Sequence, residues 1–300
     1  MNIIDEIRKL KKEKDAIVLA HNYQIPEIQE IADIVGDSLK LSQEAAKAKE
    51  GLVVLSGVHF MAESVKILSP NKKVLLPVKD AGCPMADMVD VQRLKALKAS
   101  YPGIPVVSYV NTSAEVKAES DICCTSSNAI KIIKSMDSDK IIFTPDKNLG
   151  HYIANQVSNK ELILWDGFCI VHHRVLSEDI KEIKRLHPEA LLLVHPECQP
   201  SVQVEADFLG STSQIINFAS QSEAKTFVIG TEVGVLHSLQ KRNPNKKFYL
   251  LSPGLICANM KKTSLEDIRD AILNEENEII VDEEVRVRAE LSLKKMLEMS

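Results

Sequence analysis

Three cysteines at nearly equal intervals are the residues whose type and spacing best fit a chemical role. Cys83, Cys169 and Cys257 are separated by 86 and 88 residues, and none belongs to a CxxC pair. Three thiolates brought together would form an incomplete soft-metal site with one open coordination position. An iron–sulfur cluster on three cysteines would likewise leave one iron free. A lone buried cysteine usually acts as a small hydrophobe, but three at matching positions favour a metal centre.

The other three cysteines, Cys123, Cys124 and Cys198, have no counterparts at this spacing. Adjacent cysteines rarely pair with each other, because their geometry does not suit a disulfide. We interpret all three as packing residues. Cys198 follows Glu197, so it could line a site without acting in it.

The spaced cysteines belong to a longer internal repeat. Asp33, Asp121 and Asp207 are 88 and 86 residues apart, and three Asn-Lys dipeptides that precede apolar runs keep the same intervals. A period this long exceeds that of solenoid repeats and indicates three copies of a whole domain. Each copy alternates short, continuously apolar runs with amphipathic segments, a pattern typical of parallel strands covered by helices.

We therefore predict an α/β fold with three pseudo-threefold-related α/β/α domains around a central active site. The predicted domains are residues 1–98, 99–185 and 186–262, each carrying one of the spaced cysteines, followed by a helical tail at 263–300 that packs on them. Functional groups of such sheets gather at the carboxyl ends of the strands, so the three ends would face a common centre.

Polar side chains occur where the first strand of each copy is predicted to end. They are His21 and Tyr23, Tyr109 and Asn111, and His195 and Glu197. His172, three residues after Cys169, could reach the same cavity. These groups are candidate acids and bases beside a Lewis acid.

The second strands lead into predicted helix starts that carry hydroxyl groups. The residues are Ser38, Ser126, Ser211 and Thr212. Ordinary N-capping accounts for part of this pattern. Three helix starts aimed at one centre would also form an anion trap, suited to several carboxylates or a phosphate. Neither a Walker motif nor GxGxxG is present, which argues against nucleotide binding.

Composition narrows the class of protein. The 300 residues include 37 Lys and Arg against 42 Asp and Glu, which argues against a polybasic nucleic-acid or membrane surface. No apolar run approaches the length of a membrane span. The charged, amphipathic N-terminus lacks an apolar signal core, and the cysteine usage suits metal or catalysis, so we expect a cytoplasmic protein.

Residues 9–263 resemble the quinolinate synthase family of NAD biosynthesis. The motifs that carry the resemblance are "LAHNYQIPEIQEIADIVGDSL", "GVHFMAE", "YVNTSAE", "PDKNLGHY", "VHPEC", "GSTSQII" and "IGTEVG", with "GCPMADM", "GFCIVHH" and "ICANMKK" around the cysteines. The resemblance implies a [4Fe–4S] cluster on Cys83, Cys169 and Cys257. It also implies condensation of iminoaspartate with dihydroxyacetone phosphate to quinolinate, with release of phosphate and two waters.

The resemblance also implies roles for the polar residues. Tyr23, His21 and Glu197 would handle protons, and the remaining polar and hydroxyl residues named above, with His172, would hold carboxylates and phosphate. Iminoaspartate would come from an L-aspartate oxidase or dehydrogenase. Two alternatives from the residues alone are a non-catalytic iron–sulfur or metal sensor and a three-thiolate zinc hydrolase. A sensor would need an output surface, such as a basic helix, and the sequence shows none.

Overall fold

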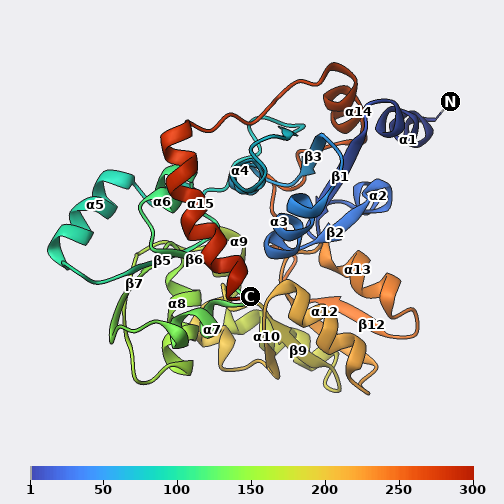
Figure 1. The fold of residues 1–300 in the computed structure, drawn as a ribbon. Coiled ribbons are helices and arrows are strands. Elements are labelled where there is room, and N and C mark those ends of the chain that lie inside the picture. Colours follow the sequence, from blue (N-terminus) through green and yellow to red (C-terminus); the bar gives the residue numbers. More distant parts are fainter. Residues whose placement is uncertain (1) are drawn as a thin grey trace.

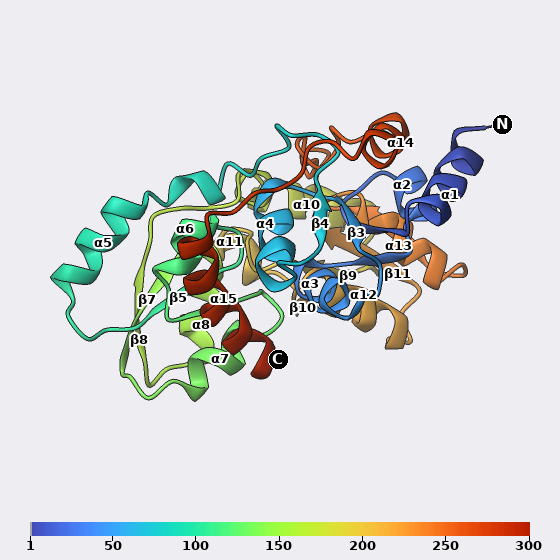
Figure 2. The same cartoon turned by 45° about the horizontal axis from the view of Figure 1, so that its top comes forward.

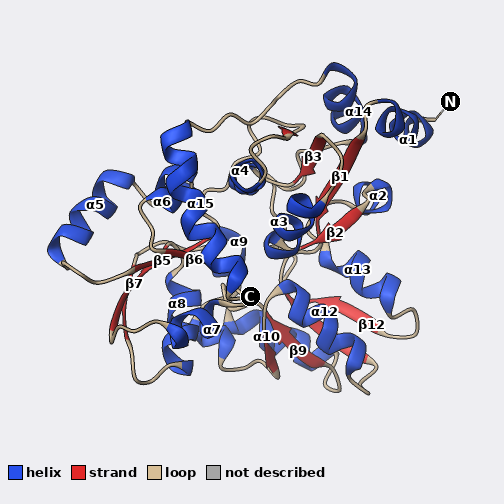
Figure 3. Ribbon diagram, viewed as in Figure 1, coloured by secondary structure: helices blue, strands red, loops and turns tan. Residues whose placement is uncertain are grey.

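The computed structural model describes residues 2–300 as an α/β protein with three four-stranded parallel sheets (Figure 1; Figure 3). The first sheet contains β1 (Ala16–His21), β2 (Ile34–Gly36), β3 (Leu52–Ser56) and β4 (Lys73–Leu75). The second contains β5 (Val106–Tyr109), β6 (Ile122–Cys124), β7 (Lys140–Thr144) and β8 (Glu161–Leu164). The third contains β9 (Leu191–Val194), β10 (Phe208–Leu209), β11 (Thr226–Gly230) and β12 (Lys247–Leu250). Each sheet has the spatial order second, first, third, fourth strand, which confirms the predicted fold class and repeat.

Helices connect the strands and flank the sheets. The first repeat has α1 (Ile3–Glu13), α2 (Pro26–Ile31), α3 (Ser38–Lys47) and α4 (His59–Leu68), followed by the short 3-10 helix η1 (Ala86–Met88). The second has α5 (Val91–Ser100), α6 (Ala114–Ala118), α7 (Ala129–Ser135), α8 (Lys147–Gln156) and α9 (Ile170–His173). The third has α10 (Ser177–Leu186), α11 (Pro200–Gln203), α12 (Thr212–Gln221) and α13 (Val235–Arg242), and the tail has α14 (Leu265–Asn274) and α15 (Glu283–Glu298). None of the helices in residues 2–300 combines the length and apolar character needed to cross a bilayer.

The strands are mostly apolar because both faces of each sheet are covered. In β1, Ile17 and Leu19 belong to one hydrophobic core, whereas Val18 and Ala20 belong to another on the opposite face. Side chains alternate between the two faces of a strand, so each face needs its own apolar set. This arrangement leaves the loops at the strand ends to carry the polar residues.

The three evenly spaced aspartates join the first two strands of each sheet. The carboxylates of Asp33, Asp121 and Asp207 accept backbone N–H groups of Val18, Val106 and Leu192 at 2.8, 2.7 and 2.7 Å. In return, the backbone N–H of each aspartate donates to the carbonyl of the strand residue whose N–H its carboxylate accepts. The repeated acidic marker in the sequence is therefore a structural clip at the entrance to the second strand.

The two helices of the tail pack on different parts of the molecule. α14 packs on α1, and α15 runs beside α4 and α6, so it contacts both the first and the second repeat (Figure 1; Figure 2). Its residues Ala289, Leu293 and Met296 enter the large core that these two repeats share. The boundaries expected after residues 98 and 185 fall inside α5 and α10, the helices that lead into the second and third sheets, and they stay predictions.

Candidate active site and metal centre

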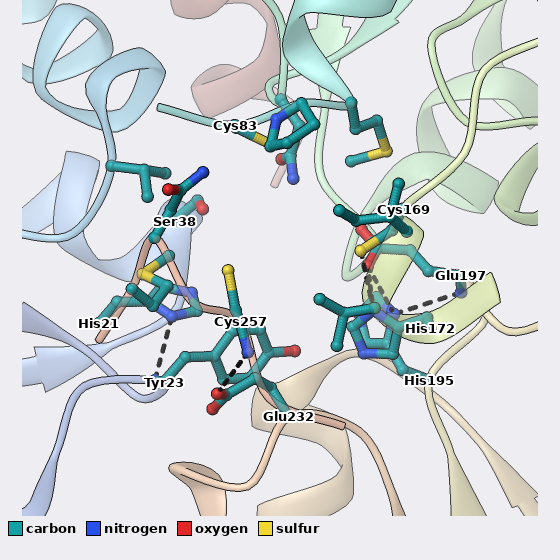
Figure 4. A pocket seen from close by; sticks show the side chains of 18 of the residues that line it. His21, Tyr23, Ser38, Cys83, Cys169, His172, His195, Glu197, Glu232 and Cys257 are labelled. Atoms are coloured by element: carbon teal, nitrogen blue, oxygen red, sulfur yellow. Dashed lines mark hydrogen bonds and ion pairs between the residues drawn. The ribbon is translucent and has the colours of Figure 1, made fainter. Parts of the chain in front are cut away.

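The three spaced cysteines come from three loops to one cavity of about 220 Å³. Cys83 lies between β4 and η1, Cys169 is the N-cap of α9, and Cys257 follows β12. All three thiols are free and partly buried. Figure 4 shows them around the cavity, each carried by a different part of the chain. The equal spacing in sequence thus becomes convergence in space.

The spacing of possible ligand atoms distinguishes two kinds of metal centre. Within residues 2–300, Cys169, His172 and Glu197 form the one group of three or more whose ligand atoms all lie within 4.8 Å of one another, so these residues could hold a metal ion. Thiolates that share one zinc ion lie roughly 4 Å apart, because each Zn–S bond is about 2.3 Å long. The three cysteines do not form such a group. Their wider arrangement fits a cluster in which each thiolate binds a different metal atom.

Two buried carboxylates hold the backbone of two cysteine loops. Asp146 Oδ2 accepts the Cys169 N–H at 3.0 Å, and Glu232 Oε1 accepts the Cys257 N–H at 3.0 Å. Both acids are fully buried, and each follows the third strand of its repeat. Val58 occupies the corresponding place in the first repeat. Sequence reasoning missed both acids, although their separation of 86 residues was a usable signal.

His21 and His195 end β1 and follow β9 with the same local geometry. Each Nδ1 accepts the backbone N–H two residues later, from Tyr23 and Glu197 respectively, at 3.2 Å. The neutral ring must then carry its proton on Nε2, and in His195 this nitrogen lies 3.2 Å from Ser126 Oγ. Burial is the main cause that lowers the pKa of both rings to about 4. Both histidines are therefore neutral N–H donors at neutral pH.

Glu197 is a buried carboxylate supported by hydrogen bonds. Its Oε2 lies 2.7 Å from His172 Nδ1, which is also 3.2 Å from Cys169 Sγ. Burial opposes ionisation, but interactions with His195 and His172 and a hydrogen bond from Tyr109 outweigh it and lower the pKa of Glu197 to about 2. The site thus contains an ionised acceptor beside one of the cysteines.

A hydrogen-bonded chain connects Tyr23 to Glu197. The Tyr23 hydroxyl lies 2.7 Å from Thr231 Oγ1, which lies 2.9 Å from His172 Nε2, and His172 Nδ1 reaches Glu197. A second hydroxyl, that of Thr212, is 2.8 Å from the Tyr23 oxygen. Burial, and secondarily the charge of Glu197, raise the pKa of Tyr23 well above its usual range. Sequence reasoning did not single out Thr231, which directly follows β11 within the motif "IGTEVG".

Tyr109 and Asn111 of the second repeat line the same cavity, as expected. Burial first, and then Glu197, raise the pKa of the Tyr109 phenol. The buried Asn111 Oδ1 has no hydrogen-bond partner within residues 2–300. A buried polar atom without a partner is costly, and a ligand in the cavity could supply one.

The helix starts are less symmetric than predicted. α3 begins at Ser38 and α12 at Thr212, and both residues line the cavity. α7 begins only at Ala129, because Asn128 Oδ1 accepts the Thr125 N–H at 2.7 Å and holds the preceding residues in a turn. Ser126 lines the cavity from this turn and not from a helix start, which corrects the expectation.

Charge also differs among the helix starts. The N-cap of α3 is Asp37, a carboxyl group that lines the cavity and was not singled out in the sequence. Ser211 is the N-cap of α12, where its hydroxyl accepts the Gln214 N–H at 3.3 Å, and it is not among the residues that line the cavity. The predicted anion trap therefore consists of fewer free helix starts than expected, with Arg174 at the cavity as a cationic complement.

The cysteines outside the repeat pattern are fully buried. Cys123 and Cys124 lie in β6 within the large shared core, and the Cys123 sulfur is 3.3 Å from Ser292 Oγ of α15. Cys198 belongs to a core beside the third sheet and is not among the residues that line the cavity. These positions agree with a packing role for all three.

Comparison with known proteins gives a consistent result. A family model described as quinolinate synthetase A protein matches residues 5–298. A quinolinate synthase from Alkaliphilus metalliredigens is 69% identical over 99% of this chain and 98% of the relative. Relatives of the same name from Caldicellulosiruptor bescii and Clostridium kluyveri are 58% and 52% identical, each over 98% of this chain and 97% of the relative.

Proposed function

The chain belongs to the quinolinate synthetase A protein family, and on this premise we propose that it is the quinolinate-forming enzyme of NAD biosynthesis. In the proposed reaction, iminoaspartate and dihydroxyacetone phosphate condense to quinolinate with release of phosphate and two waters, which makes the enzyme a transferase. The observation that carries the proposal is the convergence of Cys83, Cys169 and Cys257 on a cavity that also contains neutral histidines and an ionised glutamate.

Cys83, Cys169 and Cys257 would hold a [4Fe–4S] cluster. The free thiols, their spread around the cavity and the carboxylates behind two of the loops support this assignment. When bound, a three-cysteine cluster supplies an iron with an open position, which serves as a Lewis acid for dehydration without net redox change. His172 and Glu197 lie beside Cys169, so they would border this cluster.

Tyr23, His21 and Glu197 are the proposed proton-transfer residues. Glu197 is ionised and can accept a proton at Oε2, and its bond to His172 connects it to the Tyr23 hydroxyl. His21 can donate from Nε2 because its Nδ1 already accepts a backbone N–H. A buried acid–base set at one cavity suits the isomerisation and ring closure that the product requires.

The substrates are a dicarboxylate and a phosphate ester, and both need polar donors. The proposed binding residues are His21, Ser38, Tyr109, Asn111, Ser126, His172, His195, Glu197, Ser211 and Thr212. Neutral histidine N–H groups and hydroxyls suit these anions better than the carboxylate of Asp37 does. Ser211 would act indirectly, through the start of α12, because its hydroxyl caps that helix.

The substrate iminoaspartate implies a source. We propose that an L-aspartate oxidase or dehydrogenase supplies it, since such a reaction converts the amine of aspartate to an imine. A cytoplasmic location is part of this proposal, and the six free cysteines support it.

Anaerobic reconstitution tests the proposal. The wild-type protein should contain iron and acid-labile sulfide and form quinolinate from the two substrates. Changing Cys83, Cys169 or Cys257 to Ser should abolish both the cluster and quinolinate formation. Cys124→Ala is the matched control and should retain its iron.

The same measurements separate the alternative functions. Zinc without sulfide would favour a three-thiolate zinc site, and a cluster without quinolinate formation would favour a sensor. Loss of iron in Cys124→Ala, with retention in a spaced-cysteine variant, would contradict the ligand assignment.

A further inference from the structure

A buried lysine lies beside α4, the helix of the first repeat that precedes Cys83 in the chain. Lys117, in α6, is 0% exposed, and its ammonium donates a hydrogen bond to the Thr112 carbonyl. The ammonium also lies 5.5 Å from the centre of the Phe60 ring. Glu63, a nearby acid, is instead 3.7 Å from His59 Nδ1 and accepts the Ala114 N–H. No carboxylate of residues 2–300 lies within ion-pair distance of Lys117, so the structure buries a cation at a cost.

The equivalent positions of the other repeats carry neutral amides. Gln29 and Gln203 are 88 and 86 residues from Lys117, in the corresponding helices α2 and α11. Each glutamine Nε2 donates to two carbonyls of its own repeat and to one of a neighbouring repeat, Gly234 for Gln29 and Asn148 for Gln203. The bond from Lys117 to Thr112 repeats part of this pattern. An amide is thus sufficient for joining the repeats, so this joining role does not by itself require a charge at Lys117.

Phe60, whose ring faces the Lys117 ammonium, also lines the cavity that contains the three spaced cysteines. Phe60 holds the position equivalent to Asn148 and Gly234, by the same spacing of 88 and 86 residues. Phe60 and Cys83 line the main cavity, and both also line a second cavity of about 160 Å³ together with Glu63. Glu63 therefore shares a cavity with Cys83, and the Lys117 ammonium lies against the ring of Phe60, which lines both cavities. Burial lowers the pKa of Lys117, and negative charge at Glu63 and the cysteines counteracts this effect.

We propose that Lys117 balances the negative charge of a cluster bound at Cys83 and that Glu63 acts in the opposite sense. The inference rests on the proposed function, because it requires the cluster. Three thiolates and the cluster sulfides add negative charge to a partly buried site, where a nearby ammonium is stabilising. Such a cation favours the reduced cluster, which is the more negative state, whereas a nearby carboxylate disfavours it.

The midpoint potential of the cluster reports this electrostatic effect. In Lys117→Gln, which inserts the residue used by the other repeats, we expect the ratio of reduced to oxidised cluster at a fixed potential to fall about tenfold. In Glu63→Gln the ratio should rise. A redox titration of the reconstituted holoproteins, followed by electron paramagnetic resonance of the reduced cluster, measures both.

The two opposite signs separate charge from packing. Lys160→Gln is the control, because its ammonium also binds backbone carbonyls but precedes β8, at the edge of the sheet away from the cysteines, and its potential should be unchanged. Unchanged potentials in both test variants, or shifts of the same sign, would overturn the inference. If Lys117→Gln fails to fold, the Glu63→Gln shift decides. A wild-type protein that takes up no iron and sulfide would instead contradict the proposed function.

Discussion

At the scale of single residues, the site separates groups that donate protons from one that accepts them. His21 and His195 are neutral because burial disfavours their charge, and backbone N–H groups occupy their Nδ1 atoms. Glu197 is ionised although it is buried, because interactions with His195 and His172 and a hydrogen bond from Tyr109 outweigh the effect of burial on its pKa. Environments that push the pKa values of neighbouring groups in different directions define acid and base assignments.

Removing the Tyr23 hydroxyl tests its proposed chemical role. Tyr23→Phe keeps the ring but breaks the chain through Thr231 to His172. We expect a folded protein with an intact cluster and a turnover lower by about 100-fold, the usual scale for a general acid–base group. Anaerobic quinolinate assays measure the loss. Tyr249→Phe, which alters a tyrosine that stacks on His187 outside the cavity, should keep normal turnover, and near-normal turnover in Tyr23→Phe would move the proton chemistry to His21 and Glu197.

Buried neutral histidines should make the metal-free protein sensitive to acid. The pKa of His195 is lowered from 6.5 to about 4, so its contribution to stability is complete above the unfolded pKa and is lost as pH falls from about 6.5 toward 4. From pH 7 to pH 5 we expect the free energy of unfolding to fall by about 2 kcal/mol through this group.

Urea unfolding of the metal-free protein at the two pH values measures this loss. His195→Gln should reduce the pH dependence by the same amount, whereas the exposed His151→Gln should not. An equal pH dependence in wild type and His195→Gln would show that the ring is not held neutral by burial.

At the scale of elements, one position along a helix separates a capping residue from a cavity residue. The Ser211 hydroxyl caps α12 and accepts a hydrogen bond from Ser127 Oγ at 2.7 Å, whereas Thr212, the first residue of the helix, lines the cavity and contacts Tyr23. Successive residues at a helix start point in different directions, so adjacent hydroxyls serve different purposes. In the second repeat, the turn before α7 presents Ser126 without a helix start.

This difference predicts distinct effects of two neighbouring substitutions. Thr212→Ala should weaken substrate binding by about 1.5–3 kcal/mol, the value of a charge-assisted hydrogen bond, without a change in the cluster spectrum. Ser211→Ala should instead lower the free energy of unfolding by about 1 kcal/mol through loss of the N-cap. Steady-state kinetics and urea unfolding distinguish the two. Unaltered kinetics in Thr212→Ala would leave that hydroxyl without a binding role.

At the scale of the whole molecule, the cavity depends on how three similar sheets are held together. Gln29 and Gln203 join neighbouring repeats through backbone carbonyls, and α15 joins the first and second repeats through a shared core. Each repeat contributes one cysteine loop, so a shift between repeats would separate the thiols. The tail helix α15 is therefore part of the framework of the site even though it contributes no residue to the lining of the cavity.

The contribution of α15 can be measured with two leucines of the same helix. Leu293 is 0% exposed in the shared core, and Leu291 is 61% exposed. Leu293→Ala should lower the free energy of unfolding by about 2–5 kcal/mol, as expected for a buried leucine. Leu291→Ala should change it by less than about 0.5 kcal/mol. Similar values for both variants in urea unfolding would contradict the packing of α15 between the repeats.

The repeat and its consequences were readable in the sequence. The intervals of 86 and 88 residues identified Cys83, Cys169 and Cys257, and the apolar runs identified parallel sheets whose strand ends carry His21, Tyr23 and Glu197. These features are periodic, and a periodic pattern records which residues occupy equivalent positions.

Only the tertiary structure decided which side chains meet. Asp146 and Glu232 accept the backbone N–H groups of cysteines more than twenty residues later in the chain. Thr231 connects Tyr23 to His172 across different repeats. The direction of a side chain at a loop or helix start, and the contacts between repeats, depend on packing that no local pattern records. The charge at Lys117 is visible in the sequence, but its burial beside Phe60 is a property of the fold alone.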